Sequence, residues 1–394
     1  MTADQSSSHS QKIAVKSTNY PSISRLTITG FRSYERLVLN LDARPVILTG
    51  PNGSGKTNIL EAISCLGPGR GLRSAPKVDL ARIVHGCLSE TWGVHAVLET
   101  GTDRTEIATG LGGGKSGGRQ ITQINGRAST ATEAAQTIRL VWLTPAMDRL
   151  FIEGAGNRRR FYDRLVLAFD PGHGTRVNAY EKAMRERMRL LRDETYDRGW
   201  VAALETRMAE NGLAIAASRQ ALLTALMASI QKGQSDLSRF PAAELNLTCE
   251  VQSWLEQMSA LDCEERFSEA LADNRAMDAG AGRALRGVHR ADLLVRHARK
   301  QIGAAQCSTG EQKALLISIL LAHARLQKQE GPGRTPILLL DEITAHLDEA
   351  RRHQLFDAIN DLGVQAWMTG TEQSIFDEWG TRAQYISVPD LAGL

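Results

Sequence analysis

Apolar and polar positions alternate with a period of two in several short segments of this chain, a pattern that predicts β-strands. Residues 25–31 alternate in this way, and residues 44–50 form a second strand that leads directly into a glycine-rich loop. Three further strand-like pieces lie between Thr91 and Gly126, and Asn125-Gly126 is a hairpin turn signal. We therefore expect a small antiparallel sheet in this region.

Other segments carry helical periodicity or unbroken apolar runs. Residues 57–67 have the period of a helix and are followed by Pro68. Residues 336–342 and 364–371 are continuous apolar runs of the kind buried in a parallel sheet. The chain is mostly helical between about residues 177 and 273, with one strand expected at 244–251. An insert of this length forms a short helical arm but not a long coiled-coil rod, because a helix rises about 1.5 Å per residue.

Composition and charge indicate a soluble, globular protein. The 394 residues suffice for two domains or for one domain with an insertion, and 42% are hydrophobic and 23% charged. A net charge of +3 excludes a polycation but allows a local basic face. The cysteines form no CxxC pair, the first twenty residues lack the apolar core of a signal peptide, and the run at 314–324 is too short to span a bilayer. We expect a cytoplasmic protein without a membrane partner, and a disordered tail at residues 1–22.

The glycine-rich loop matches the phosphate-binding pattern GxxxxGK[ST] in full, and it lies between a strand and a helix, as the pattern requires. Its glycines let backbone N–H groups turn toward phosphate oxygens, Lys56 reaches the outer phosphates, and Thr57 offers a hydroxyl to Mg²⁺. A chance match is the alternative, and the strand–helix context disfavours it. The predicted ATP-binding residues are Gly50, Pro51, Asn52, Gly53, Ser54, Gly55, Lys56, Thr57 and Asn58.

Two adjacent acids, Asp341 and Glu342, follow the apolar run "ILLL". An aspartate at the end of a buried strand can hold Mg²⁺ together with Thr57. Glu342 is then placed to orient or deprotonate the water that attacks the γ-phosphate. The alternative is that the two acids simply end a strand, but the phosphate loop favours a hydrolytic site with ATP and Mg²⁺ as cofactors. We predict Glu342 as the catalytic residue and Thr57 and Asp341 as the metal site.

The segment "CSTGEQ" resembles the signature of ABC ATPases, with the predicted signature residues Ser308, Gly310, Glu311 and Gln312. An ordinary capped helix is the alternative, because a serine in this position is a good helix cap by itself. Signature and phosphate loop lie on opposite edges of one ABC head, so the resemblance implies that the signature contacts the nucleotide of a second copy. Residues 344–348 resemble the D-loop of the same proteins, with Asp348 at its end, although Asp348 can also simply begin the next helix.

Several longer segments resemble the RecF family, ATPases of bacterial DNA replication and repair that are related to the SMC proteins. They include "GPNGSGKTNILEAISCLGPGRGLRS", "RRRFYDRLV", "GVHRADL", "STGEQKALLISILLA" and "LLLDEITAHLD", in family order. The resemblance implies an α/β fold, namely an ABC-ATPase head with a P-loop mixed sheet and a small antiparallel β subdomain. Residues 23–170 and 286–394 would form this head, and residues 171–285 an inserted, mainly helical arm or lid.

The same resemblance implies a function and partners. ATP would drive head-to-head homodimerisation on DNA, and weak, DNA-stimulated hydrolysis would release it. Recombinational repair, the SOS response, binding at single-strand–duplex junctions, and the partners RecR and RecO are implied in the same way. Arg32 in "FRSYE" resembles a family position that contacts nucleotide phosphates, with a solvated surface arginine as the alternative.

Some positions depart from the family pattern. Val288 and Ala291 replace residues of a common G-P-H-R-D-D-L segment, and Ala146 replaces a frequent glutamate. A γ-phosphate-sensing histidine is missing after the last strand, so we expect Thr369 or Thr371 to take that role. Gln120, Gln123 and Gln136 are weak candidates for a Mg²⁺-sensing glutamine.

Basic clusters are candidates for contacts with the DNA backbone, which need no base readout. The candidate residues are Arg158, Arg159, Arg160, Arg185, Arg189 and Arg192. The last three fall on one face of a helix, but interspersed acids make a solvated, ion-paired face an equal alternative.

Two other functions compete with a DNA-binding ATPase. An ABC transporter subunit is disfavoured by the missing histidine, the helical arm and the "FRSYE" segment. A non-catalytic, nucleotide-dependent scaffold is disfavoured by Glu342, because a carboxylate there has no evident scaffold role.

Overall fold

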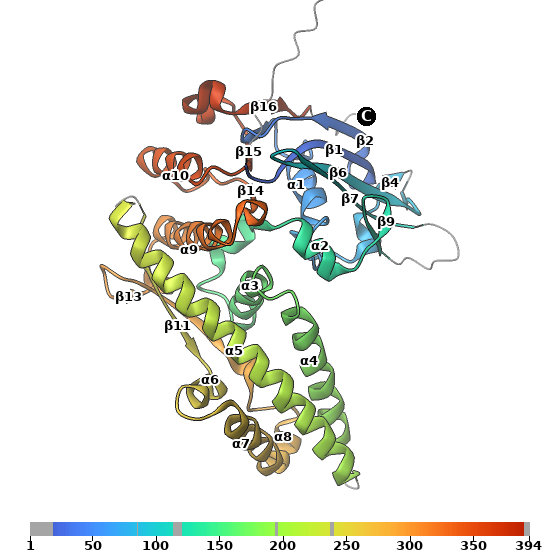
Figure 1. Ribbon diagram of the computed structural model, residues 1–394, viewed down its shortest axis with the longest axis vertical. Coiled ribbons are helices and arrows are strands. Elements are labelled where there is room, and N and C mark those ends of the chain that lie inside the picture. The colour runs from blue at the N-terminus through green and yellow to red at the C-terminus, as the bar shows by residue number, and fades with distance from the viewer. Residues whose placement is uncertain (1–18, 85, 113–119, 194–195, 237–239, 390–394) are drawn as a thin grey trace, which may run out of the picture.

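Two sheets and their covering helices form one end of the molecule, and a helical arm extends from it (Figure 1). This computed structural model describes residues 19–389 apart from residues 85, 113–119, 194–195 and 237–239. Most of the tail expected at residues 1–22 therefore lies outside the described residues, and β1 already begins at Ser22.

An antiparallel sheet of six strands has the order β2-β1-β6-β7-β8-β9. Its strands are β1 (Ser22–Phe31), β2 (Tyr34–Asn40), β6 (Trp92–Thr100), β7 (Asp103–Leu111), β8 (Gln120–Ile124) and β9 (Arg127–Ala128). The antiparallel sheet predicted between Thr91 and Gly126 is confirmed, and Asn125-Gly126 turns the chain from β8 into β9. The sheet is larger than predicted because the N-terminal hairpin of β1 and β2 pairs with β6. A separate hairpin, β4 (Ile83–Val84) and β5 (Cys87–Leu88), and the helix α2 (Ala131–Thr137) lie beside it.

A second sheet is parallel throughout and has the order β10-β14-β15-β3-β16. Its strands are β10 (Leu140–Leu143), β14 (Ile337–Leu340), β15 (Ala366–Gly370), β3 (Val46–Thr49) and β16 (Gln384–Ser387). The predicted strands at 44–50, 336–342 and 364–371 are confirmed as β3, β14 and β15. Strands β10 and β16 were not predicted.

The parallel sheet divides the head into two hydrophobic cores, because successive side chains of a strand point to opposite faces. Val46 and Leu48 of β3 pack with α1 (Lys56–Ser64) and the antiparallel sheet, whereas Ile47 packs on the other side. That other side is covered by α9 (Thr309–Gln329) and α10 (Glu349–Leu362). Helices α1 and α9, which begin at the phosphate loop and at the signature, therefore lie on opposite faces of the sheet.

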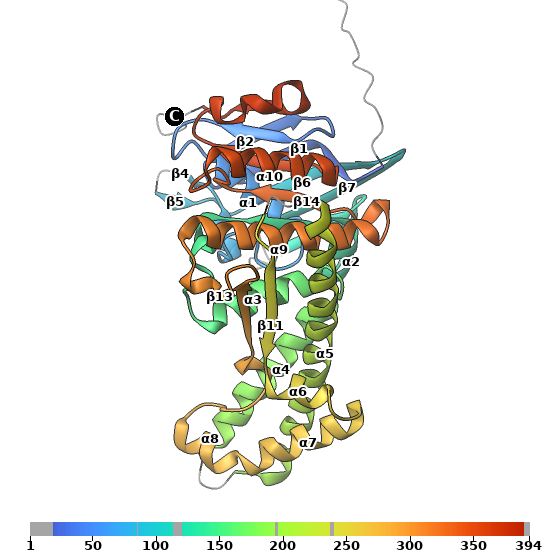
Figure 2. The same cartoon turned by 90° about the vertical axis from the view of Figure 1, so that its left-hand side faces the viewer.

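The arm is built from helices with a three-stranded sheet alongside (Figure 2). The helices of the arm and of its junction with the head are α3 (Ala155–Leu167), α4 (His173–Leu190), α5 (Arg198–Asp236), α6 (Glu250–Leu255), α7 (Ala260–Asp273) and α8 (Arg275–Ala281), and the strands are β11 (Ala243–Thr248), β12 (Asp292–His297) and β13 (Ile302–Gly303). Helix α3 and the strands β12 and β13 lie outside residues 171–285, and α3 and β12 share a hydrophobic core with α9 of the head. The predicted strand at 244–251 is too long. Thr248 pairs with Asp292, the first residue of β12, so the chain has no partner strand beyond it and turns into α6.

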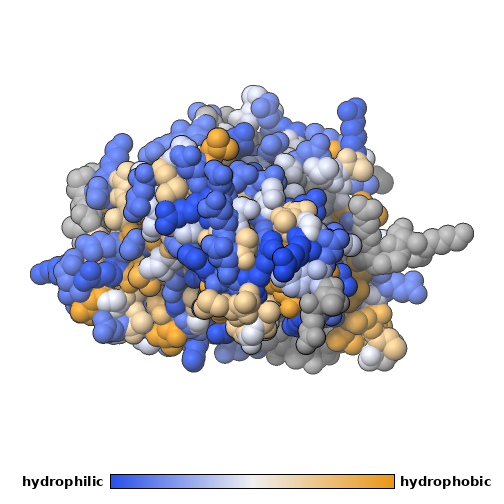
Figure 3. Space-filling model, turned by 90° about the horizontal axis from the view of Figure 1, so that it is seen from below, coloured by the Kyte–Doolittle hydropathy of each residue, from blue (hydrophilic) through white to orange (hydrophobic). Residues whose placement is uncertain are grey.

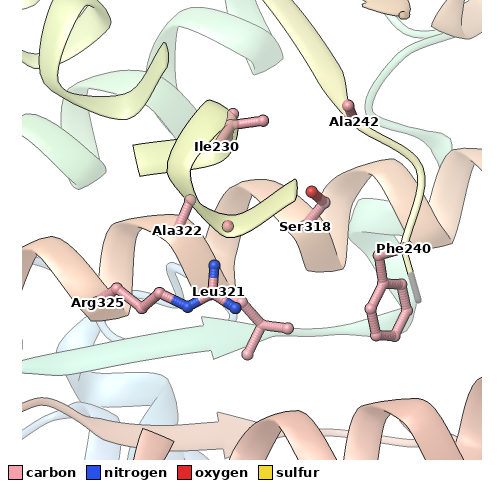
Figure 4. Close-up of a pocket in the computed structure, with 8 residues that line it drawn as sticks. Ile230, Phe240, Ala242, Ser318, Leu321, Ala322 and Arg325 are labelled. Carbon is pink, nitrogen blue, oxygen red and sulfur yellow. The ribbon is translucent and has the colours of Figure 1, made fainter. Parts of the chain in front are cut away.

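Helix α5 connects the far end of the arm to the head (Figures 1 and 2). Its stretch Arg198–Gly233 is long and apolar enough to cross a membrane, but half of its most apolar window is buried inside the protein. It packs on α4 and α7 in the arm and on α9 in the head, as expected of a core helix. Where α5 meets α9, Ile230, Phe240 and Ser318 help to line a cavity of about 20 Å³ (Figure 4). This space admits no more than a water molecule.

Candidate nucleotide site

The predicted phosphate loop joins β3 to α1 at the carboxyl-terminal edge of the parallel sheet. Gly50 has a φ of +148°, and a Cβ there would lie 2.3 Å from the Val388 carbonyl oxygen. Gly55 has a φ of +100° at the N-cap of α1 and makes no side-chain cap. Only glycine accepts such positions without strain. The loop thus leaves the first N–H groups of α1 without a capping side chain, which suits an anion.

Lys56 lies over this loop. Its Nζ donates to the carbonyl oxygens of Gly50 and Pro51, each at 2.7 Å. Burial lowers the pKa of Lys56, and the nearby acids Glu342 and Asp341 oppose this shift. A lysine that reaches across its own loop is placed to contact phosphate groups held by the loop.

Two buried hydroxyls, that of Ser54 within the loop and that of Tyr34 beside it, have no hydrogen-bond partner among the residues that the structure describes. A Cβ on Gly55 would lie 2.8 Å from the Tyr34 hydroxyl, so this side chain touches the loop. Burial raises the pKa of Tyr34 to about 12, which keeps its proton available for donation. Buried polar atoms without partners are uncommon. Together with the loop and Lys56, they fit the phosphates of ATP.

Three oxygen-bearing side chains from three different elements meet next to the loop. The Thr57 hydroxyl donates to Asp341 Oδ1 at 2.9 Å, and the Thr369 hydroxyl donates to the same oxygen at 2.9 Å. Thr57 belongs to α1, Asp341 follows β14, and Thr369 lies in β15. A hydroxyl beside a carboxylate is a suitable pair of ligands for Mg²⁺. The structure thus brings together both residues of the predicted metal site.

Glu342 has an unusual backbone conformation at this point. Its φ is +46°, in the left-handed region that non-glycine residues rarely adopt. Its backbone N–H donates to the Thr369 hydroxyl at 2.8 Å, while its side chain is exposed. Of the two expected γ-phosphate sensors, Thr369 lies inside this cluster and is fully buried, whereas Thr371 is exposed. The geometry therefore favours Thr369.

Arg32 is held by protein groups beside α1 rather than by the loop. Its Nε and Nη2 donate to the two carboxylate oxygens of Glu61 at 2.9 and 3.0 Å, and its Nη1 donates to the Asp79 carbonyl. Arg73 also contacts Glu61, at 3.1 Å, and donates to the side-chain oxygen of Asn58. Arg73 was not predicted, although it lies in the "GRGLRS" segment. A nucleotide contact by Arg32 stays a prediction, and it would compete with this ion pair.

The predicted signature segment lies at the start of α9, and Ser308 is the N-cap of this helix. Ser308 accepts from the Glu311 N–H at 3.4 Å, and the Glu311 carboxylate accepts from the Ser308 N–H, so the two form a capping box. Lys300 donates to Glu311 at 2.6 Å and lowers the pKa of this carboxyl to about 2. The buried Gln312 side chain donates to the Cys307 carbonyl and points inward. Of the four signature residues, only Ser308 and Gly310 are therefore suited to reach another molecule.

The residues that resemble a D-loop turn away from β14 and end in a helix cap. Asp348 accepts from the Arg351 N–H at 2.8 Å and begins α10. His346 has a φ of +62°, and its carbonyl oxygen lies 3.2 Å from the position of a Cβ on Gly310. This turn thus lies directly against the start of α9 in the same chain.

Two of the six predicted DNA-contacting arginines have internal roles. Arg158 forms a two-pronged ion pair with Asp292, at 2.7 and 2.8 Å, and donates to carbonyl groups near the start of α3. Arg159 donates to the Ala291 carbonyl at 2.7 Å. These contacts join α3 to the start of β12 and to the residue before it. Arg160 is exposed and donates to the side-chain oxygen of Asn157.

The arginines of α4 divide by helix face. Arg185 is exposed and pairs with Glu181 at 3.3 Å, while Arg189 and Arg192 are exposed without a recorded acidic partner in the described part of the chain. Arg187, between them, is fully buried and pairs with Glu205 and Asp278 at 2.9 and 2.6 Å. The surface seen from the arm end is mainly polar, with apolar residues scattered over it (Figure 3). DNA contact by Arg185, Arg189 and Arg192 stays a prediction.

Comparison with known proteins agrees with this geometry. Residues 22–387 match the family described as the RecF/RecN/SMC N terminal domain. The chain is 50% identical over 367 residues to a protein of Mesorhizobium japonicum named DNA replication and repair protein RecF, covering 93% of this chain and 96% of that protein. A protein of the same name from Brucella suis is 49% identical over 368 residues, with 93% and 94% covered.

Solved structures show the same fold. The structure of the recombination mediator protein RecF-ATPrS in the RecFOR pathway has a TM-score of 0.79 at 22% identity and covers 91% of this chain and 95% of that one. The Smc head domain derived from Pyrococcus furiosus has a TM-score of 0.51 at 19% identity, with 94% of each chain covered. The predicted α/β class with an ABC-type head and a helical insertion is confirmed, but the sheet that carries the phosphate loop is parallel throughout rather than mixed.

Proposed function

This chain belongs to the RecF/RecN/SMC N-terminal domain family, and from this premise we propose that it is an ATP-dependent DNA-binding protein of DNA replication and recombinational repair. ATP brings two heads together on DNA, and slow hydrolysis separates them. One observation carries the proposal: the hydroxyls of Thr57 and Thr369 both donate to Asp341 Oδ1 beside the phosphate loop, and Glu342 is the residue after Asp341. The names of the close relatives support the biological setting.

Each group in the site has a role in hydrolysis. The N–H groups at the start of α1 and the Lys56 ammonium bind phosphate oxygens and neutralise their charge. A bound Mg²⁺, held by Thr57 and Asp341, would supply further positive charge to the phosphates. Glu342 is exposed at the edge of the site, where its carboxylate can orient a water molecule and accept its proton. Positioning and charge neutralisation supply most of the catalysis in phosphoryl transfer.

A second copy completes the site. Helix α9 lies on the opposite face of the parallel sheet from α1, so Ser308 and Gly310 are suited to the nucleotide held by a partner. In a symmetric pair each head supplies one phosphate loop and one signature, and both sites form together. We expect slow ATP hydrolysis, because the paired, ATP-bound state is the working state, and the family resemblance implies that DNA stimulates it.

The proposal that DNA and further proteins are partners of this chain rests on its family. Backbone contacts by exposed arginines such as Arg189 and Arg192 suit duplex DNA or single-strand–duplex junctions. RecR and RecO, a cytoplasmic location and a place in the SOS response complete the proposal. A transporter subunit has less support, because the two close relatives are named as replication and repair proteins and the apolar α5 is packed within the fold.

The decisive experiment is light scattering of Glu342→Gln with and without ATP and DNA. This variant keeps the phosphate loop and metal residues but lacks the carboxylate for water, so it should accumulate as an ATP-bound dimer with turnover lowered at least about 100-fold. A protein that stays monomeric in every condition refutes the dimer mechanism. Unchanged ATP turnover in Glu342→Gln refutes the catalytic role of this residue. If the wild type also shows no turnover, a non-catalytic scaffold is the better account.

A further inference from the structure

A buried lysine of the signature helix contacts the backbone of the catalytic turn. Lys313 lies in the second turn of α9, and only 2% of its side chain is exposed. Its Nζ donates to the Ala345 carbonyl at 2.8 Å, to the Glu342 carbonyl at 3.3 Å and to Asp148 Oδ2 at 3.5 Å. An ammonium has three donors and here finds three acceptors. A lysine is almost never this buried unless it is paired, so the acceptors account for its position.

Lys313 contacts Glu342, a residue with an unfavourable backbone conformation. Glu342 has a φ of +46°, which persists in a non-glycine residue only where the surroundings hold it. Its N–H donates to the Thr369 hydroxyl, and its carbonyl accepts from Lys313 Nζ as well as from the Ala345 N–H at 3.1 Å, so side chains from two other elements contact both backbone polar groups. The direction of the Glu342 side chain follows from this backbone conformation.

Lys313 also holds the rest of the turn. The Ala345 carbonyl is its shortest contact, and the next residue, His346, again has a positive φ, of +62°. Burial lowers the pKa of Lys313, while Asp148, Glu342 and Asp341 oppose the shift. The side chain thus forms a link from α9 to the start and the middle of the turn that runs from Asp341 to Asp348.

We propose that Lys313 is a positioning residue that holds Glu342 of its own chain in the orientation needed for ATP hydrolysis. It does not touch the nucleotide, and it acts through the Glu342 backbone. This inference rests on the proposed function, because it needs a hydrolytic site with Glu342 at its centre. It predicts an effect on kcat with little effect on the KM for ATP, since the phosphate loop is untouched.

Lys313→Met keeps the length of the side chain and removes its hydrogen bonds. We expect it to lower kcat at least about tenfold while KM stays within about twofold, as for loss of an interaction made only in the transition state. The matched control is Lys328→Met in the same helix. Lys328 donates to the Leu362 carbonyl at the end of α10, away from the turn, and its loss should leave kcat within about twofold. Equal losses in both variants would show a general effect on α9 and overturn the proposal.

Mixed dimers distinguish an action within one chain from an action through the signature. Differently tagged chains are purified as ATP-bound pairs in which one chain carries Glu342→Gln, so that only the other chain's site turns over. Lys313→Met on the chain with intact Glu342 should lower the remaining hydrolysis at least about tenfold. The same change on the Glu342→Gln chain should preserve it, because that chain's own site is already inactive. Loss in both placements, or loss only in the second, overturns the proposal.

Two checks keep the result interpretable. If Lys313→Met does not fold, Lys313→Gln is measured in the same pairings with the same expected asymmetry, and symmetric loss again overturns the proposal. If the wild-type pair neither forms with ATP nor hydrolyses it, the proposed function itself fails. That outcome is seen before any Lys313 variant is made, so the two failures are distinct.

Discussion

Ser308 has two roles that can be separated by substitution. Within its own chain it caps α9, through a hydrogen bond of 3.4 Å from the Glu311 N–H. This long bond contributes at the lower end of the range for helix caps, about 0.5–1 kcal/mol. Between chains, its hydroxyl would donate to a charged phosphate, and such a bond contributes about 1.5–3 kcal/mol. A symmetric dimer has two of these contacts, so the dimer would lose about 3–6 kcal/mol, or at least about a hundredfold in Kd.

Two substitutions separate the roles. Ser308→Asn keeps a good cap but replaces the hydroxyl with a larger amide, whereas Ser308→Ala loses the cap and stays small. In urea titrations we expect Asn to remain within about 0.5 kcal/mol of the wild type and Ala to lose up to about 1 kcal/mol. In sedimentation with ATP, both should fail to form the dimer, while the ATP affinity of the monomer stays unchanged.

Comparing dimerisation with the free energy of unfolding in the two variants decides between the roles. If dimerisation tracked the free energy of unfolding, with Ala impaired and Asn normal, the segment would be a local cap and nothing more. If either variant lost ATP binding as a monomer, the signature would contact the nucleotide of its own chain. Both results would refute the assignment of Ser308 to a partner's site.

Three further changes test other parts of the structure. Thr369→Val removes a donor from Asp341 and an acceptor from the Glu342 N–H, and it should lower the kcat for ATP hydrolysis about tenfold; an unchanged kcat would contradict its role. Arg187→Leu removes the arginine that pairs with buried Asp278 and leaves Arg275 as the ion-pair partner of Glu205, and it should cost about 3–5 kcal/mol in urea titrations, whereas Arg189→Leu on the exposed face should cost under about 0.5 kcal/mol. Burial lowers the pKa of His323 from 6.5 to about 4, so stability that is complete above pH 6.5 should fall by about 3 kcal/mol as the pH drops toward 4; urea titrations across this range should show a flatter profile for His323→Gln.

Contiguous motifs could be predicted because their chemistry is local. The phosphate loop, the acids after β14 and the cap at Ser308 each need only a few neighbouring residues and a strand or helix beside them. The strands predicted from apolar runs were confirmed for the same reason, since a run such as "ILLL" is buried on both faces. Strand β16 carries only partly buried and exposed residues, so its sequence lacks this signal.

Charged residues could not be assigned to surface or core from sequence alone. Arg185, Arg187 and Arg189 are equally basic, yet Arg187 is the one whose side chain points between α5 and α8. Arg158 likewise pairs with Asp292, a residue 134 positions away in sequence. A basic cluster reports where arginines lie along the chain, whereas their partners come from segments that only the fold brings near.

The residues around Asp341 come from separate segments of the chain, so no single segment predicts their arrangement. Thr57 follows β3, Asp341 follows β14, and Thr369 belongs to β15. Because β15 lies between β14 and β3 in the sheet, Thr369 is placed between the other two and can bond Asp341 and Glu342 at once. The order of strands in the sheet differs from their order in sequence, so no pattern in the segment "MTGTE" separates Thr369 from Thr371. The same holds for Lys313, because its side chain meets the carbonyl groups of Glu342 and Ala345 only when α9 packs against β14. Residues that bind phosphate can be read from a motif, but residues that aim the catalytic carboxylate depend on which strands and helices become neighbours.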